Sequence, residues 1–202
     1  MFWNTVAGAY DIFVNVINGK THRELKTIVG DLIEPEDRVL ECACGTGMLS
    51  AVIAEKCVSL TATDFAPKML KYAEKNCAAF RNVVFQQEDI LSLDFPDNSF
   101  DKVVAGNVIH LLDDPLKALN ELNRVCKPDG KLIIPTYMER DQKSGTSIFV
   151  RMAGKAGADF KHQFTLDSYR KFFLDAGYAD VKVQLAEGRI PCAVASMTKK
   201  CG

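Results

Sequence analysis

The 202-residue chain lacks any long apolar run and any excess of charge of one sign. No apolar stretch approaches the roughly 18 residues of a membrane-spanning helix, and the first residues do not resemble a secretory signal. The 25 Lys and Arg nearly cancel the 26 Asp and Glu, which leaves a formal charge of -1. Nucleic acid and anionic membranes are therefore poor candidates for a partner. We expect a cytoplasmic protein with no stable membrane association, whose partner is a small molecule.

The chain also lacks the cysteine and histidine spacings of a metal site or a disulfide framework. Its seven Cys form no Cys-x-x-Cys pair and are not interleaved with its three His. A scattered, odd set of Cys is typical of reduced thiols that pack as small apolar side chains. We therefore expect no bound metal.

Short β-branched apolar runs alternate with segments of helical periodicity, and this alternation predicts an α/β fold in a single domain over residues 1–202. Strands are expected at residues 38–42, 58–63, 83–87, 102–106, 131–136, 181–186 and 192–198. Helices are expected at residues 48–56, 66–79, 114–126 and 164–177. This order predicts a doubly wound, Rossmann-like sheet of seven strands, mostly parallel with an antiparallel C-terminal hairpin. Ligands of such sheets bind at the carboxyl ends of the strands.

Two further segments flank this predicted sheet. Residues 3–16 and 20–32 have the periodicity of amphipathic helices, so we expect an N-terminal helical cap over residues 1–34. Glycines and polar residues surround a short apolar patch after the fifth strand, which is typical of a mobile loop. We expect a lid-like insertion over residues 137–164.

The most informative feature is a strand that ends in an acid and enters a glycine turn. Glu41 lies at the end of the first predicted strand, Ala43, Gly45 and Gly47 follow it, and Asp64 comes directly after the second. Glycine lets the backbone bend sharply and lets a ligand approach the N–H groups, while a carboxylate at a strand end can accept from both hydroxyls of a ribose. This pattern predicts a site for an adenosine ligand.

The turn lacks the third glycine of the dinucleotide motif Gly-x-Gly-x-x-Gly. In that motif the third glycine lets the helix pack closely while the helix N-terminus faces a pyrophosphate. Here Met48, Leu49 and Ser50 follow the turn instead. Glu41 also places a carboxylate where it would repel a pyrophosphate and attract an ammonium group. A phosphate-free, zwitterionic ligand such as S-adenosyl-L-methionine fits both facts.

Over residues 10–198 the chain resembles the class I S-adenosylmethionine-dependent methyltransferases that modify small molecules, with a type 11-like domain. Family members show a Leu-Asp-x-Gly-Cys-Gly-Thr-Gly turn. Residues 40–47 match it, with the acid Glu41 in place of Asp and with Ala43 in place of the first glycine. The acid and the hydrophobe at the family's ribose site match Asp64 and Phe65.

The resemblance implies further site residues. It assigns the adenine contact to Asp89, next to Ile90, the methionine end of the cofactor to Asn107, and an aromatic lid over the cofactor to Tyr10. Alternatives stay open, since Asp64 can cap a helix, Asp89 can be a solvated loop acid and Tyr10 a core aromatic. The predicted cofactor-binding residues are Tyr10, Glu41, Ala43, Gly45, Gly47, Asp64, Phe65, Met69, Asp89, Ile90 and Asn107.

The resemblance also implies methyl transfer from S-adenosyl-L-methionine to a small-molecule acceptor by in-line displacement, with S-adenosyl-L-homocysteine as product. Because the leaving group is a cationic sulfur, we expect catalysis mainly by positioning and water exclusion. His110 is the candidate general base, or else part of the pocket wall, and Tyr137 and His162 are candidates for acceptor contact. A nicotinamide-dependent oxidoreductase and a noncatalytic cofactor-binding relative remain alternatives. The sequence sets neither the acceptor nor the oligomeric state.

Overall fold

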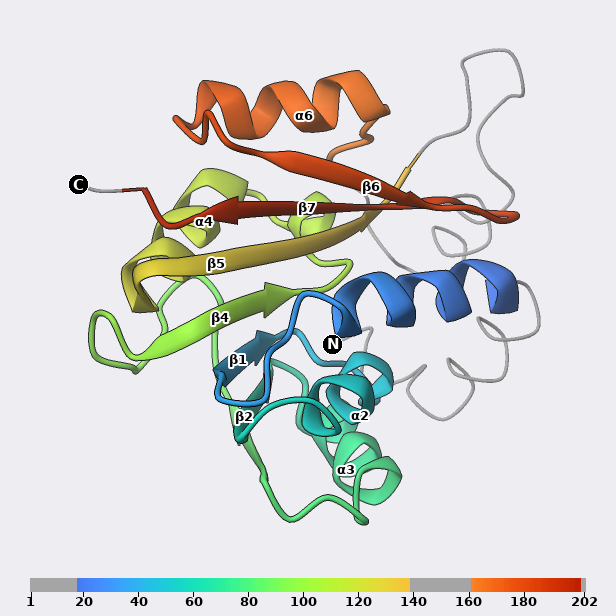
Figure 1. Cartoon of the computed structure of the whole chain (residues 1–202), viewed down its shortest axis with the longest axis vertical. Helices are drawn as coiled ribbons and strands as arrows, with labels where there is room; N and C mark the ends of the chain where they lie inside the picture. The colour runs from blue at the N-terminus through green and yellow to red at the C-terminus, as the bar shows by residue number, and fades with distance from the viewer. Residues whose placement is uncertain (1–17, 139–160, 201–202) are drawn as a thin grey trace.

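The computed structural model describes residues 18–138 and 161–200. Figure 1 shows how its strands and helices are arranged. The strands are β1 (Arg38–Cys42), β2 (Ser59–Asp64), β3 (Val83–Gln87), β4 (Phe100–Ala105), β5 (Cys126–Tyr137), β6 (Lys182–Ala186) and β7 (Cys192–Thr198). The helices are α2 (Met48–Ala54), α3 (Pro67–Asn76), α4 (Pro115–Val125) and α6 (Leu166–Asp175), together with the short 3-10 helix η1 (Ile109–Leu111). Residues 18–30 are also helical.

All seven strands belong to one sheet with the order β3-β2-β1-β4-β5-β7-β6. The pairs among β1 to β5 are parallel, whereas β7 is antiparallel to both β5 and β6. The carboxyl ends of β1, β4 and β5 therefore lie at one edge, where Figure 1 shows the blue helix of residues 18–30. The predicted doubly wound, mostly parallel sheet with an antiparallel C-terminal hairpin is confirmed.

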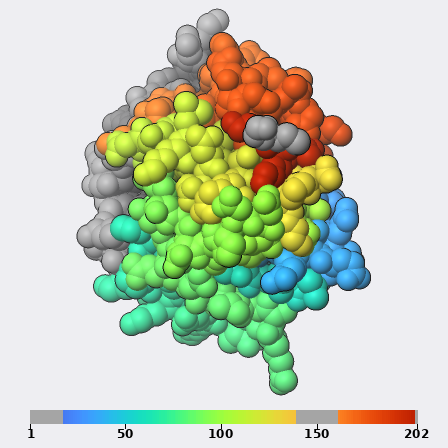
Figure 2. Space-filling model, turned by 90° about the vertical axis from the view of Figure 1, so that its left-hand side faces the viewer, coloured from blue at the N-terminus to red at the C-terminus, as the bar shows by residue number. Residues whose placement is uncertain are grey.

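Side chains that alternate along the strands feed two hydrophobic cores, one on each face of the sheet. Leu40 packs in the core under α4 and α6, whereas its neighbour Val39 packs in the core under α2, α3 and residues 18–30. Figure 2 shows the side of the molecule where β4 and β5 begin. Side chains of neighbouring segments pack against each other on this side. The two layers of helices thus leave the carboxyl edge of the sheet as the place for a ligand.

The bounds agree with the sequence prediction to within a few residues at most ends, with two differences. β5 begins at Cys126 instead of residue 131, because a register shift between Phe100 and Lys102 accommodates the extra residues beside β4. Within this stretch Asp129 has a left-handed backbone conformation, with φ of 63°. The second difference is η1, which no periodic pattern marks because it is only one turn long.

The cap and the lid that the sequence predicts fall largely outside the described residues, which exclude 1–17 and 139–160. The described part of the cap is residues 18–34, of which residues 18–30 form a helix. The division into one domain over residues 1–202, with a cap over 1–34 and a lid over 137–164, stays a prediction. None of the helices in the described part of the chain is long and apolar enough to cross a membrane.

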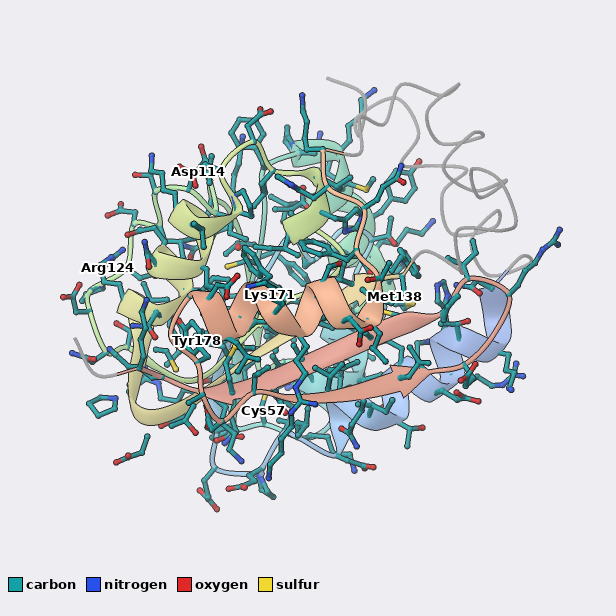
Figure 3. The ribbon with its side chains drawn as sticks, turned by 90° about the horizontal axis from the view of Figure 1, so that it is seen from above. Cys57, Asp114, Arg124, Met138, Lys171 and Tyr178 are labelled. Carbon is teal, nitrogen blue, oxygen red and sulfur yellow. The ribbon has the colours of Figure 1, made fainter. Side chains whose placement is uncertain are left out.

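The start of α4 depends on one exposed carboxylate, that of Asp114 (labelled in Figure 3). Asp114 Oδ1 accepts a hydrogen bond from the Lys117 N–H at 2.9 Å, and Pro115 occupies the first turn. Asp114→Ala is expected to lower the free energy of unfolding by about 1 kcal/mol, because one helix N–H loses its acceptor. Urea unfolding measures the change, with Asp113→Ala as the control. Equal stability of the two variants would show that Asp114 contributes no cap.

Candidate functional site

The glycine turn joins β1 to α2 in a left-handed backbone conformation. Ala43, Gly45 and Gly47 have φ of 56°, 57° and 89°, a region that favours glycine. At Gly47 a Cβ would also lie 3.0 Å from Cys77 Sγ and 3.2 Å from Ala73 Cα. The two glycines therefore let the turn form, and Gly47 additionally lets α2 and α3 approach each other.

Asp64, the last residue of β2, holds this turn in place. Its Oδ2 accepts from the Gly45 N–H at 2.9 Å, and its Oδ1 accepts from the Ala66 N–H at 2.8 Å. Burial raises the pKa of the Asp64 carboxyl above its ordinary value, while the two N–H donors act in the opposite direction. Asp64 therefore holds the turn and the residue before α3, but it does not cap this helix, since the N-cap residue is Ala66, with no side-chain capping hydrogen bond. The same carboxylate also lines the pocket described next.

A pocket of about 410 Å³ opens beside the turn, at the carboxyl ends of β1, β2 and β4. Most of the predicted cofactor-binding residues contribute to its wall. The nine that do so are Glu41, Ala43, Gly45, Asp64, Phe65, Met69, Asp89, Ile90 and Asn107. Residues from four separate segments of the sequence therefore meet at one site, as the order of the motifs predicts.

Glu41 gives this pocket its most unusual electrostatic feature. The side chain is 2% exposed, and its Oε2 accepts a hydrogen bond from Ser50 Oγ at 2.5 Å. Burial raises the pKa of Glu41 to about 8, the nearby Asp64 raises it further, and the Ser50 hydroxyl opposes the rise. A carboxyl group that titrates near neutrality can ionise when a cation binds beside it.

Three predicted site residues are not among the described residues that line the pocket. Gly47 shapes the turn through its contacts with α3, and Tyr10 lies outside the described residues. His110, in η1, is 4% exposed, and the His162 N–H donates to its carbonyl at 3.1 Å. Burial, with a smaller effect of His162, lowers the pKa of His110 to about 4, so the ring is neutral at physiological pH. This placement gives no support to His110 as the general base.

No sequence pattern indicated His22, which the fold brings into the pocket. Its Nε2 lies 2.8 Å from Tyr137 Oη, and both residues line the pocket. His22 comes from the helix over residues 18–30, and Tyr137 is the last residue of β5. The two are 115 positions apart in the sequence, so no local spacing could have paired them.

The pocket has an acidic region and an apolar region. Glu41, Asp64 and Asp89 come from the ends of β1 and β2 and from the loop after β3. Apolar side chains in the wall include Met48, Leu49, Val108, Leu111 and Leu112. Such a wall excludes water from a reacting group. Among residues 18–138 and 161–200 there is no group of three side chains suited to hold a metal ion.

The sheet topology, the glycine turn and the carboxylate at the end of β2 define a Rossmann-like protein built for an adenosine cofactor without phosphates. Residues 40–134 match the family model described as a methyltransferase domain. The demethylmenaquinone methyltransferase of Renibacterium salmoninarum is 34% identical over 137 residues, which is 67% of this chain and 56% of that protein. The enzyme of the same name from Staphylococcus aureus is 26% identical over 212 residues, covering 93% of this chain and 88% of that protein.

Solved structures show the same fold. A phosphoethanolamine N-methyltransferase of Haemonchus contortus, in complex with S-adenosylhomocysteine, has a TM-score of 0.76 at 16% identity, covering 98% of this chain and 58% of that chain. A methyltransferase of Thermotoga maritima has a TM-score of 0.71 at 21% identity, covering 98% and 99%. The chain belongs to the class I S-adenosylmethionine-dependent methyltransferases. It transfers the methyl group of S-adenosyl-L-methionine to a small-molecule acceptor, and the oxidoreductase and noncatalytic alternatives are not favoured.

Proposed function

We propose that the pocket holds the cofactor with its adenine at Asp89 and Ile90, its ribose at Asp64 and its methionine end between Glu41 and Asn107. The observation that carries this proposal is the convergence of nine predicted residues on one pocket. The residues fit the cofactor chemically, because the buried Glu41 carboxyl suits an ammonium group and Asp64 suits a pair of ribose hydroxyls. Tyr10 remains part of the proposal as a residue that covers the cofactor.

When bound, the cofactor supplies an electrophilic methyl group on a cationic sulfur. The chain contributes orientation and a dry site. Met48, Leu49 and Leu111 shield the pocket from water, and the glycine turn fixes the depth at which the methionine end enters. Catalysis by positioning of an in-line displacement is the mechanism that this arrangement favours.

For the acceptor, we propose an apolar aromatic ring that bears a hydroxyl group, such as a naphthoquinol in its two-electron reduced form. The relatives named above are demethylmenaquinone methyltransferases, and a quinone of that kind is apolar when reduced except for its hydroxyl groups. Leu111, Leu112 and Val108 offer such a ring an apolar wall, and His22 and Tyr137 offer polar groups at the same pocket. Reduction matters because an electron-rich ring attacks a methyl donor far better than a quinone does.

We also propose a single methyltransferase domain over residues 1–202 that acts in the cytoplasm. Six cysteines in the described segments are buried free thiols, which is typical of a reducing compartment. A formal charge of -1 disfavours nucleic acid as the acceptor. The proposal is independent of the oligomeric state.

The purified chain is expected to bind S-adenosyl-L-homocysteine at micromolar or lower concentration and NAD far more weakly. Isothermal titration measures both affinities. Tritium from methyl-labelled S-adenosyl-L-methionine is then expected to enter 1,4-dihydroxynaphthalene kept reduced under anaerobic conditions, with heat-inactivated protein as the control. Tighter binding of NAD would contradict the cofactor assignment. Tight cofactor binding without transfer to this or any other hydroxylated ring would contradict the proposed acceptor.

A further inference from the structure

We propose that Tyr137 binds the hydroxyl group of the acceptor and that His22 acts through Tyr137 by receiving its proton. The inference rests on the proposed function, because it takes the acceptor to be a hydroxylated ring. Two observations carry it. Nε2 of His22 lies 2.8 Å from Tyr137 Oη, and His22 is the one histidine among the described residues that line the pocket.

The helix that carries His22 is fastened to the turn between β6 and β7. Asn18 Nδ2 donates to the Ile190 carbonyl at 2.9 Å, and the Ile190 N–H donates back to Asn18 Oδ1 at 3.0 Å. The Thr21 hydroxyl donates to Asn18 Oδ1 at 2.7 Å. Asn18, Thr21 and His22 are all buried. These hydrogen bonds fix the rotation of the helix about its axis and therefore the direction of the His22 side chain.

Tyr137 is fastened to the same part of the structure. It pairs with Cys192 on β7, and the following Met138 N–H donates to the Pro191 carbonyl at 2.8 Å. The anchor of the helix, Ile190, and the strand partner of Tyr137 are thus two residues apart in one continuous segment. Figure 3 shows Met138 at the end of the sheet where the helix of residues 18–30 also lies. One continuous segment, residues 190–192, therefore contacts both the helix of His22 and the strand of Tyr137.

The geometry allows two successive proton transfers, from the acceptor to Tyr137 and from Tyr137 to His22. The acceptor's O–H bond breaks as its proton moves to the Tyr137 oxygen, and the phenolic proton of Tyr137 moves to Nε2 of His22. The acceptor becomes an oxyanion and His22 an imidazolium, so no electron is gained or lost and the total charge is unchanged. In the resting state the Tyr137 hydroxyl then donates to an unprotonated Nε2. Formation of the oxyanion strengthens the nucleophile, and such proton transfer typically contributes about 100-fold or more to a rate.

Other ionisable groups line the same pocket or adjoin the pair, and they bear on its pH dependence. They come from the pocket wall, from the strand beside Tyr137 and from the helix beside His22. These groups are Glu41, Cys44, Asp64, Glu88, Asp89, Cys192, Arg23 and Glu24. The test therefore compares variants of the pair with each other and does not rest on the wild-type pH profile alone.

Tyr137→Phe is expected to lower kcat for 1,4-dihydroxynaphthalene about 100-fold while leaving the Kd of S-adenosyl-L-homocysteine within about twofold. His22→Gln keeps a hydrogen-bonding side chain but cannot accept the proton, so a similar loss is expected, together with loss of the acidic limb of the pH profile. Tyr72→Phe, on the exposed face of α3, is the matched control. A His22→Gln variant with wild-type kcat and an unchanged pH profile would overturn the role of His22.

A second readout does not depend on turnover. The neutral and ionised forms of 1-naphthol absorb differently, so its pKa can be measured while it is bound to the protein with S-adenosyl-L-homocysteine. Wild type and Tyr72→Phe are expected to lower the pKa of bound 1-naphthol relative to water, and His22→Gln and Tyr137→Phe are expected to restore it. Equal pKa values of the bound probe in wild type and both pair variants, or no binding of the probe to wild type, would overturn the inference.

The two experiments separate the inference from the proposed function. If wild type transfers the methyl group and both His22→Gln and Tyr137→Phe keep full activity, the proposed proton transfer is wrong and the proposed function stands. Absence of methyl transfer by wild type removes the proposed acceptor, whereas the naphthol titration still decides whether the pair ionises a bound hydroxyl group. Thermal unfolding of each variant identifies any that fails to fold, and the other variant then supplies the answer.

Discussion

Glu41→Gln is expected to reduce the fall in the free energy of unfolding that the wild-type protein shows between about pH 6 and about pH 9. In the folded protein, burial raises the pKa of Glu41 from its ordinary 4.5 to about 8. The folded state therefore holds this proton more tightly than the unfolded chain does. The resulting stabilisation is fully present below pH 4.5 and is lost as the pH rises through the folded-state value of about 8.

The size of the effect follows from linkage. One pKa unit corresponds to about 1.4 kcal/mol, so the wild type is expected to lose roughly 3 kcal/mol over this pH interval from Glu41 alone. Glutamine has nearly the same shape and can still accept from the Ser50 hydroxyl, but it has no proton to lose. Urea unfolding of both proteins at the two pH values measures the difference. Glu74→Gln, an exposed change on α3, is the matched control and is expected to keep the wild-type slope.

The same substitution tests the contact with the cofactor's ammonium group. If that group binds beside Glu41, the carboxyl must ionise, so binding of S-adenosyl-L-homocysteine at neutral pH is expected to release a proton in wild type and none from this site in Glu41→Gln. Isothermal titration in two buffers of different ionisation enthalpy measures the released proton. Equal proton release by the two proteins would show that Glu41 stays neutral and does not face the ammonium group.

The sequence was most informative where function and local backbone conformation coincide. Gly45 and Gly47 are recognisable because left-handed φ values favour glycine. The motif spacing placed Asp64, and the family resemblance placed Asp89, at the sheet edge where both line the pocket. Three strands, β1, β3 and β7, have the predicted bounds. These features depend on neighbours in the sequence or on the fixed geometry of a parallel sheet, and both are visible in periodicity and turn residues.

The sequence was least informative where distant segments meet. The position of His22 depends on the hydrogen bond between Asn18 and Ile190, which are 172 residues apart. No local sequence pattern predicts such a contact. His110 was a reasonable candidate base because it follows β4, yet η1 places it in the core with a lowered pKa. A short 3-10 helix can redirect a side chain without leaving a periodic signal. On the proposed acceptor side, the sequence named Tyr137 but not its partner His22, whereas most of the proposed cofactor contacts were predicted from the sequence.

Asp64→Ala is expected to weaken binding of S-adenosyl-L-homocysteine by about 1.5–3 kcal/mol, the range for loss of a charged hydrogen-bond partner. This corresponds to about 10- to 150-fold in Kd. Besides any contact with the ribose, the carboxylate holds the glycine turn, because it accepts from the N–H groups of Gly45 and Ala66. A loss of affinity alone would therefore not distinguish a ribose contact from a loosened turn. Asp31→Ala, at an exposed position outside the described pocket wall, is the control.

A cofactor analogue without the two ribose hydroxyls separates the two tasks of Asp64. If the carboxylate accepts from the ribose, wild type is expected to bind 2′,3′-dideoxy-S-adenosylhomocysteine more weakly than the parent compound, whereas Asp64→Ala binds both alike. If Asp64 only holds the turn, the ratio of the two affinities will be the same in both proteins. This double-mutant logic isolates the pairwise contact. Because the turn is disrupted equally for both ligands, its contribution cancels, and the difference that remains measures the contact between Asp64 and the ribose.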